Sequence, residues 1–244
     1  MHEKSDPELL RDYAEHRSEA AFREIVSRYT DMVYSAALRQ VTSPEAARDV
    51  AQNVFADLAA KAGVIMGRPA GEAPLAGWLY RSTRFLALNH RRDEQRRLTR
   101  ERQVMDQIDS NPGTEPEWER IRPVLDEAMA DLNESDRDAL LLRFFKSRDF
   151  RAIGQALGIS DDAAQKRVTR ALDKLRAEFV RRGVTTTALA LSSTLSANAV
   201  TAAPAGMVTI FSTSGLAGAA ALSTAATTTT TTAVKTIAMT VLQK

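Results

Sequence analysis

Apolar residues recur at intervals of three and four throughout the first 182 residues, and the alternation typical of a half-buried strand is absent. The clearest apolar stripe predicts a helix over residues 19–40. A second helix is expected to begin at Ser43-Pro44, a typical N-cap followed by proline in the first helical position, and to continue to about residue 60. The pattern therefore predicts an all-α protein.

The helix expected after Ser43 has an apolar and a polar face. Its core positions are Ala47, Val50, Ala51, Val54 and Leu58. Its polar positions are Asp49, Gln52, Asn53 and Asp57. Residues 62–74 hold three glycines and two prolines and predict a loop. A further helix is expected from about Leu75 into a basic block at 91–102, with its larger apolar residues mostly in the core: Trp78, Leu79, Phe85 and Leu86.

A second helical pattern follows residue 117. Ser135 is expected to cap one helix, and a short helix over Phe150–Leu157 is expected to stop at Gly158. Ser160 then caps a longer helix whose core positions are Ala164, Val168, Ala171, Leu175 and Phe179. A short helix, a tight turn and a longer helix form the helix-turn-helix plan. A helical hairpin that packs on a protein partner shares this plan, but a basic outer face that carries a glutamine favours DNA.

Composition divides the chain into four segments. Residues 1–95 and 118–183 are periodic and rich in apolar positions, whereas residues 96–117 contain Asn111-Pro112-Gly113 and predict a flexible linker. Residues 184–244 form a low-complexity tail rich in Ala, Thr and Ser. Because this tail has few large apolar side chains, it is expected to be disordered or weakly associated with a membrane, and residues 1–183 are expected to suffice for activity.

Charge and composition narrow the function. Residues 81–102 carry eight basic and three acidic side chains, and residues 143–182 carry eleven and five, which indicates two polyanion contacts. With no cysteine and three scattered histidines, the sequence predicts no metal site, no cofactor and no catalytic residues, so the protein is not expected to be an enzyme. The charged N-terminus is unlike a secretory signal, and a cytoplasmic location is expected.

Several segments, in order, resemble the sigma-70 family of RNA polymerase sigma factors. LLLRFF at 140–145 with the segment at 149–176 resembles region four, which reads the minus-thirty-five promoter element. FREIVSRYTDMVYSAALRQVTSPEAARDVAQNVF and GWLYRSTRFLALNHRR resemble region two, which binds core polymerase and melts the minus-ten element. Over about residues 8–182 the chain resembles the extracytoplasmic-function, or group four, type. The resemblance implies a region two helical bundle and a region four helix-turn-helix domain.

The resemblance assigns roles to three sets of residues. The core-polymerase-binding set is Asp49, Gln52 and Asn53. The minus-ten DNA-binding set is Arg81, Arg84, Asn89, Arg91 and Arg92. The minus-thirty-five DNA-binding set is Gln165, Lys166, Arg167, Thr169 and Arg170. The implied partners are core RNA polymerase, promoter DNA and an anti-sigma factor, with a weak membrane contact through the tail.

Two other functions are compatible with parts of this sequence: the helix-turn-helix and the basic runs. A free-standing helix-turn-helix regulator would bind symmetric duplex sites without polymerase. A membrane-tethered helical adaptor would place its basic runs on anionic lipid. The resemblance to region two favours a sigma factor that directs promoter-specific transcription initiation.

Overall fold

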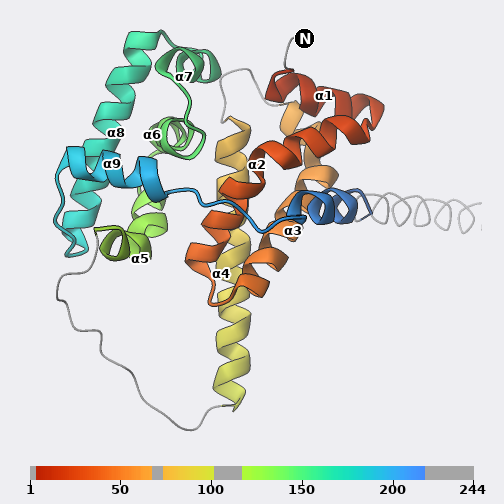
Figure 1. Cartoon of the computed structure of the whole chain (residues 1–244), viewed down its shortest axis with the longest axis horizontal. Helices are drawn as coiled ribbons and strands as arrows, with labels where there is room; N and C mark the ends of the chain where they lie inside the picture. Colours follow the sequence, from red (N-terminus) through yellow and green to blue (C-terminus); the bar gives the residue numbers. More distant parts are fainter. Residues whose placement is uncertain (1–3, 68–73, 102–116, 218–244) are drawn as a thin grey trace, which may run out of the picture.

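The computed structural model describes residues 4–67, 74–101 and 117–217 (Figure 1). All regular structure in these residues is helical, which confirms the all-α prediction. The first unit contains α1 (Asp6–His16), α2 (Glu19–Gln40), α3 (Pro44–Met66) and α4 (Leu75–Glu101). The second unit contains α5 (Glu117–Ala130), α6 (Glu134–Leu140), the π-helical turn η1 (Leu141–Phe145), α7 (Phe150–Leu157) and α8 (Asp161–Arg181). After α8 come α9 (Ala188–Asn198) and a helical stretch over residues 207–217.

Several helix ends follow from side-chain caps. Ser43 Oγ accepts the Ala46 N–H at 3.1 Å and Ser160 Oγ accepts the Ala163 N–H at 3.3 Å, so both predicted N-caps are confirmed. The cap predicted at Ser135 is wrong, because Asn133 Oδ1 accepts the Asp136 N–H at 2.9 Å and α6 begins one residue before Ser135. Helix α3 also continues to Met66, past the end expected near residue 60.

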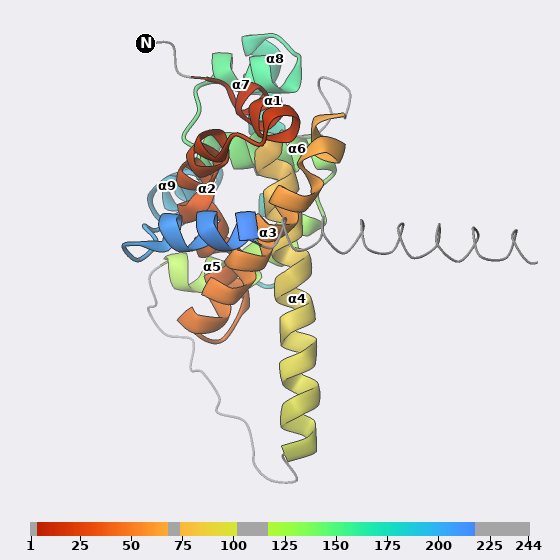
Figure 2. The same cartoon turned by 90° about the vertical axis from the view of Figure 1, so that its right-hand side faces the viewer.

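The predicted boundary at residue 95 falls inside a helix. Helix α4 runs unbroken through residue 96 to Glu101, and α5 begins at Glu117, so both ends of the expected linker 96–117 are helical. The rest of that linker lies outside the described residues. Figures 1 and 2 show that the C-terminal half of α4 projects beyond the body of the protein. Arg91, Arg92 and Arg96, the arginines of this half whose side chains the structure describes, are exposed there.

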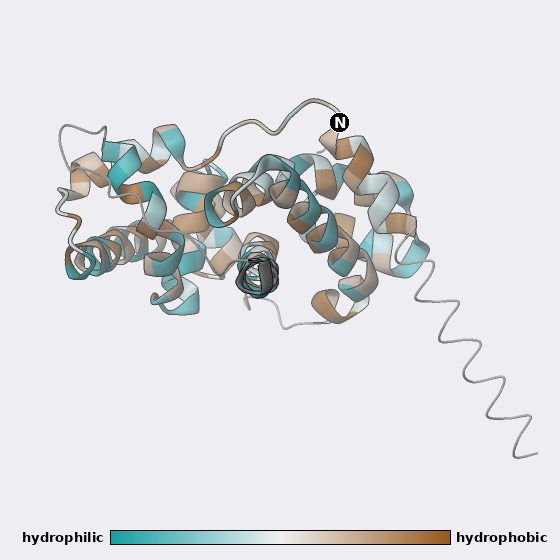
Figure 3. Ribbon diagram, turned by 90° about the horizontal axis from the view of Figure 1, so that it is seen from below, coloured by the Kyte–Doolittle hydropathy of each residue, from teal (hydrophilic) through white to brown (hydrophobic). Residues whose placement is uncertain are grey.

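The predicted core stripes are buried. The eight apolar positions of the 19–40 stripe are all less than 3% exposed: Phe22, Ile25, Val26, Tyr29, Met32, Val33, Ala36 and Ala37. The core positions named for α3 and α8 are also buried. Viewed from below, apolar positions mostly face the inside of the helical assembly and hydrophilic positions the outside (Figure 3). On α4, Trp78 and Leu79 are buried and Leu86 is half-buried against the core. Phe85 is 63% exposed, so its assignment to the core is wrong.

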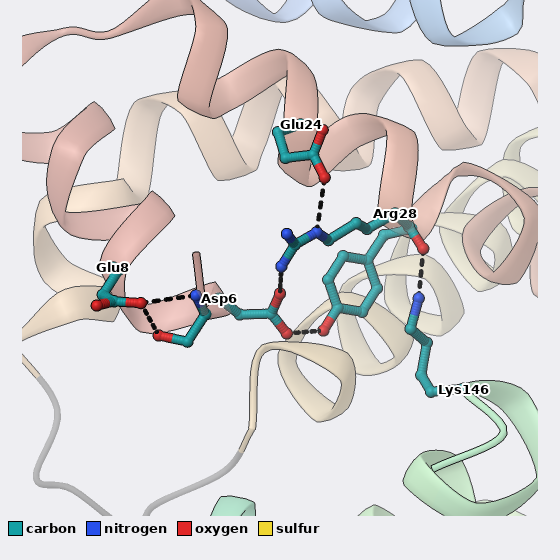
Figure 4. A network of polar contacts seen from close by, with 7 residues as sticks. Asp6, Glu8, Glu24, Arg28 and Lys146 are labelled. Atoms are coloured by element: carbon teal, nitrogen blue, oxygen red, sulfur yellow. Dashed lines mark hydrogen bonds and ion pairs between the residues drawn. The ribbon is translucent and has the colours of Figure 1, made fainter. Parts of the chain in front are cut away.

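Polar contacts join the two units. Arg39 on α2 and Asp126 on α5 form an ion pair in which both side chains are 5% exposed, and the Tyr80 hydroxyl donates to Asp126 Oδ1 at 2.6 Å. A second contact involves Lys146, which follows η1. Its ammonium donates to the Arg28 carbonyl oxygen and lies 4.1 Å from the centre of the Tyr29 ring (Figure 4). The units therefore form one continuous core.

The tail differs from the sequence expectation over residues 184–217, which we call the strap. Helix α9 packs on the second unit, and the chain then crosses to the first unit, where residues 207–217 lie beside α3 (Figure 1). The expectation of disorder is wrong here because the few large side chains of the strap, such as Leu191, Leu195 and Phe211, are buried against helices of the two units instead of building a separate core. Residues 218–244 lie outside the described residues. No helix of the described part has the length and apolar character needed to cross a membrane.

Candidate nucleic-acid and polymerase interface

The helix-turn-helix corner is built from short-range signals. Asp149 Oδ1 caps α7 through the Ala152 N–H at 2.7 Å, and Gly158 ends it with a φ of 65°, a left-handed conformation that favours glycine. The Ile159 N–H then donates to the Gly154 carbonyl oxygen at 2.9 Å. A Cβ atom on Gly154 would lie 2.7 Å from the Ile159 carbonyl oxygen, so the turn can approach α7 this closely only because Gly154 has no side chain.

Helix α8 presents most of the predicted minus-thirty-five set to solvent. Gln165, Lys166, Thr169 and Arg170 are exposed, and Arg167 is half-buried. On the opposite side of the helix Ala164, Val168 and Ala171 are buried against the second unit. The structure therefore brings four members of this set together on an open face and places Arg167 at its edge.

Helix α4 carries the predicted minus-ten set on one side. At about 100° per residue, all five positions fall within an arc of about 160°. Arg84 and Asn89 are half-buried, and Arg91 and Arg92 are exposed on the projecting half. Arg81 differs from the other members because its guanidinium forms an ion pair with Glu134 of α6 and lies 4.0 Å from Asp138 Oδ1. In this arrangement the second unit therefore covers one end of the basic face.

Phe85 lies within this arc, between Arg92 and Asn89, and the sequence analysis does not identify it as a functional candidate. Aromatic residues at helical spacing usually lie in the core, so residue type alone predicts that Phe85 is buried. The helical wheel instead indicates that Phe85 is exposed, because Leu79, Tyr80 and Ala87 are buried on the far side of α4 from Phe85. An exposed phenyl ring among arginines can stack on an unpaired base, as aromatic side chains do in single-strand binding sites.

The predicted polymerase-binding set lies on α3. Asp49 and Asn53 are exposed and Gln52 is half-buried, within an arc of about 100°. Val50, Ala51 and Val54 bury the opposite side in the core of the first unit. The three polar side chains are therefore available together, and a carboxylate beside two amides suits the arginine and backbone groups of a protein partner.

Comparisons with known proteins agree with this geometry. Residues 25–97 match the family described as Sigma-70 region 2, and residues 128–177 match Sigma-70, region 4. The chain is also similar to the ECF RNA polymerase sigma factor RpoE of Cereibacter sphaeroides, with 27% identity over 175 residues that cover 69% of this chain and 91% of that protein. The first match spans most of α2 to α4, and the second contains the helix-turn-helix. Both regions are present in order on an all-helical fold, so the chain belongs to the sigma-70 family as a sigma factor of the extracytoplasmic-function type.

Proposed function

We propose that three helices of this sigma factor make its contacts with core polymerase and with the two promoter elements. The polar face of α3 (Asp49, Gln52 and Asn53) binds core polymerase, the basic side of α4 binds the minus-ten element, and the outer face of α8 binds the minus-thirty-five element. The observation that carries the proposal is the outward cationic face of α8 behind a rigid helix-turn-helix corner. Such a helix fits the major groove, where Gln reads adenine edges and Lys and Arg reach guanine or phosphates.

For the minus-ten element the proposal uses both charge and stacking. Arg84, Arg91 and Arg92 neutralise phosphates of the melted strand, and Asn89 supplies hydrogen bonds to a base or sugar. Phe85 stacks on an unpaired base, an interaction worth about 1–3 kcal/mol. Opening a duplex costs unstacking energy, so contacts made only with the single strand favour the open promoter.

The proposal also covers where the protein acts in the cell and how its activity is regulated. A protein that acts on polymerase and promoter DNA works in the cytoplasm, and its activity is held in check by an anti-sigma factor. The helix-turn-helix alone is also compatible with a free-standing regulator, but the match to region two favours the polymerase-dependent function.

The test is transcription of a library of genomic fragments by purified core polymerase with and without the protein. We expect new start sites whose upstream sequences share two motifs, spaced as minus-ten and minus-thirty-five elements. Core polymerase alone is the control. The proposal fails if the same transcripts appear without the protein, or if the protein alone selects the same fragments as duplexes.

A further inference from the structure

The first part of the strap is fixed to the second unit. Thr187 Oγ1 caps α9 through the Ala190 N–H at 3.1 Å, and the Arg120 guanidinium donates to the Thr185 carbonyl oxygen at 3.0 Å. Leu191 and Leu195 are at most 1% exposed, in the core that α9 shares with α5, α8 and η1. Helix α9 is therefore an integral helix of the second unit.

The middle of the strap runs along α2 of the first unit. Ser35 Oγ donates to the Thr201 carbonyl oxygen and accepts the Thr201 N–H, both at 2.9 Å. The Ala203 N–H donates to Asp31 Oδ1 at 2.8 Å. These hydrogen bonds satisfy backbone groups of a segment without secondary structure, which would otherwise need water.

The last described part of the strap is packed against α2 and α3. Phe211 is fully buried, and its ring stacks on Phe55 with 5.5 Å between ring centres. A Cβ atom on Gly215 would lie 2.9 Å from the Phe22 ring, so glycine permits the close approach. Burial of the Phe211 ring removes apolar surface from water and stabilises the position of this short helix on the first unit.

The strap also takes part in the joint between the two units. The Arg39 guanidinium is paired with Asp126 of the second unit, and Nη1 of the same group donates to the Ala199 carbonyl oxygen at 2.7 Å. A buried guanidinium needs a partner for each N–H group, so the strap supplies an acceptor that the helices do not. Without the strap, the Arg39 guanidinium would lose the hydrogen bond from Nη1 to the Ala199 carbonyl oxygen.

The closed arrangement holds the two candidate DNA faces too close together for a promoter. Arg81 of α4 pairs with Glu134 of α6, and Asp136 of α6 pairs with Lys174 of α8 at 2.5 Å. A single helix of seven residues thus contacts both basic helices, so at this point α4 and α8 are separated by little more than the width of one helix, about 10–12 Å. The minus-ten and minus-thirty-five elements lie roughly 25 base pairs apart, or roughly 85 Å of B-DNA.

The strap limits how far the units can separate. Ala199, at the end of α9, and Met207, in the helix seated on the first unit, are eight residues apart in the chain. Eight extended residues span at most about 28 Å, so separation by tens of ångströms pulls one end of the strap from its unit. Helix α9 shares the core of the second unit through two leucines, whereas residues 207–217 hold the first unit chiefly through Phe211. Residues 207–217 are therefore expected to detach from the first unit before α9 detaches from the second.

We propose that residues 184–217 are an autoinhibitory strap, which keeps this sigma factor closed until residues 207–217 leave the first unit. The proposal rests on the proposed function, because it assumes that α4 and α8 read two promoter elements at once. Release of the strap uncovers Arg81 and lets the units span the promoter. Truncation after Val200, which keeps α9 and removes residues 207–217, is accordingly expected to raise promoter-dependent activity while it lowers stability.

A reversible lock tests the proposal directly. The hydroxyl oxygens of Ser35 and Thr201 are 3.2 Å apart and the chain has no cysteine, so Ser35→Cys with Thr201→Cys places two thiols within reach of a disulfide. We expect oxidation to reduce transcription by core polymerase at least tenfold and a reductant to restore it. Each single-cysteine variant is the matched control and should show no redox effect. Equal transcription from oxidised and reduced double variants would overturn the proposal.

A release variant tests the opposite direction. Phe211→Asp places a charge in the buried site, whereas Ile210→Asp places it on a neighbouring side chain that is 43% exposed. The distance between spin labels on Ala60→Cys and Ala156→Cys, at exposed positions of α3 and α7, reports on opening. We expect Phe211→Asp to lengthen this distance and raise transcription several-fold, and Ile210→Asp to match the parent. An unchanged distance in Phe211→Asp, or a longer one without any gain in transcription, would contradict the proposal.

These readouts separate the strap from the proposed function. If neither the parent nor the released variant transcribes with core polymerase while the label distance still changes, the proposed function fails and the strap remains a structural clamp. If the reduced protein transcribes and the lock has no effect, the function holds and the autoinhibitory role is wrong.

Discussion

Gly77 of α4 lies against Asp138 of α6 so closely that a Cβ atom on Gly77 would fall 2.1 Å from Asp138 Oδ1. Asp138 is 2% exposed, and its Oδ1 accepts no hydrogen bond from the part of the chain that the structure describes. The contact joins the two units at the end of α4 that also carries Arg81. A glycine thus sets how closely the units pack.

We expect Gly77→Ala to destabilise the closed arrangement by about 1–3 kcal/mol, the cost of an extra methyl group in a packed contact. Unfolding in urea measures the effect. Gly63→Ala is the matched control, because Gly63 is also helical but has open space at its Cβ position. That variant should be neutral or stabilised by up to about 1 kcal/mol, since alanine favours helix. The same loss of stability in both variants would show that the contact with Asp138 is not responsible.

The same contact makes stability depend on pH. Burial raises the pKa of Asp138 to about 6, the Glu134 carboxylate adds to the rise, and Arg81 and Arg137 oppose it. Because the folded protein then holds a proton that the unfolded chain loses near pH 4, the contribution of Asp138 to stability falls as pH rises from about 4 to 6 and is constant above that. The fall is at most about 3 kcal/mol.

Asp138→Asn isolates this effect, since the amide keeps the shape and does not titrate. The difference in unfolding free energy between the parent and this variant should decline between about pH 4 and 6, in favour of the variant at the higher pH. A difference that is flat across this range, or that rises with pH, would contradict the raised pKa.

Phe85 gives a prediction for promoter opening. We expect Phe85→Ala to lower transcription by roughly tenfold, in line with about 1–3 kcal/mol for a stacked base, while the melting temperature stays within about 2 °C because the ring is exposed. Phe85→Trp should retain activity. Val64→Ala removes an exposed apolar side chain from α3 and is the control. Normal transcription by Phe85→Ala on a promoter that needs melting would remove Phe85 from the interface.

Local signals explain how much of this fold the sequence could predict. The buried stripes of α2 and α8 and the caps at Ser43 and Ser160 depend on residues three or four positions apart, and the structure confirms them. Asn133 could replace Ser135 as a cap because both residue types are good N-caps and only geometry decides between them. For Phe85 two local signals disagree, because its side-chain type favours the core whereas its position on the helical wheel lies among the arginines and opposite the buried residues.

The strap and Arg81 depend on contacts between residues distant in sequence. Ser35 and Thr201 are 166 positions apart, and no sequence pattern around either residue predicts their hydrogen bond. A count of large apolar residues tests whether a segment can build its own core, but Phe211 and Leu191 instead complete cores built by other helices. The minus-ten role predicted for Arg81 stays a prediction, and its ion pair with Glu134 could not be predicted because it depends on how the two units pack.

The proposed polymerase contact predicts an effect of Asp49→Arg. Asp49 is exposed on α3, so charge reversal should change stability by less than about 0.5 kcal/mol. Binding to core polymerase should weaken at least tenfold, because a cation then faces the basic groups that the carboxylate was expected to pair with. Asp173→Arg, the same change at an exposed position of α8, is the control in a pull-down without DNA. Equal retention of both variants would exclude Asp49 from the binding face.

The outer face of α8 predicts how DNA binding depends on salt. Lys166 and Arg170 are exposed one turn apart, and each is positioned to reach a phosphate or a base edge. If the side chain binds a phosphate, its replacement by alanine should lower the slope of log affinity against log salt by about one and weaken binding to all promoters alike. If the side chain binds a base edge, Lys166→Ala or Arg170→Ala should leave the slope nearly unchanged and relax the preference at one position of the minus-thirty-five element.

Holoenzyme binding to promoter variants over a salt series distinguishes these two roles. Arg11→Ala removes one cation from an exposed position on α1, away from both basic helices, and should change neither slope nor preference. Core binding should stay intact in all three variants, because none of these residues lies on the α3 face. If both α8 variants bind every promoter like the parent at each salt concentration, the outer face of α8 does not contact DNA. The minus-thirty-five element must then be read by another surface of the second unit.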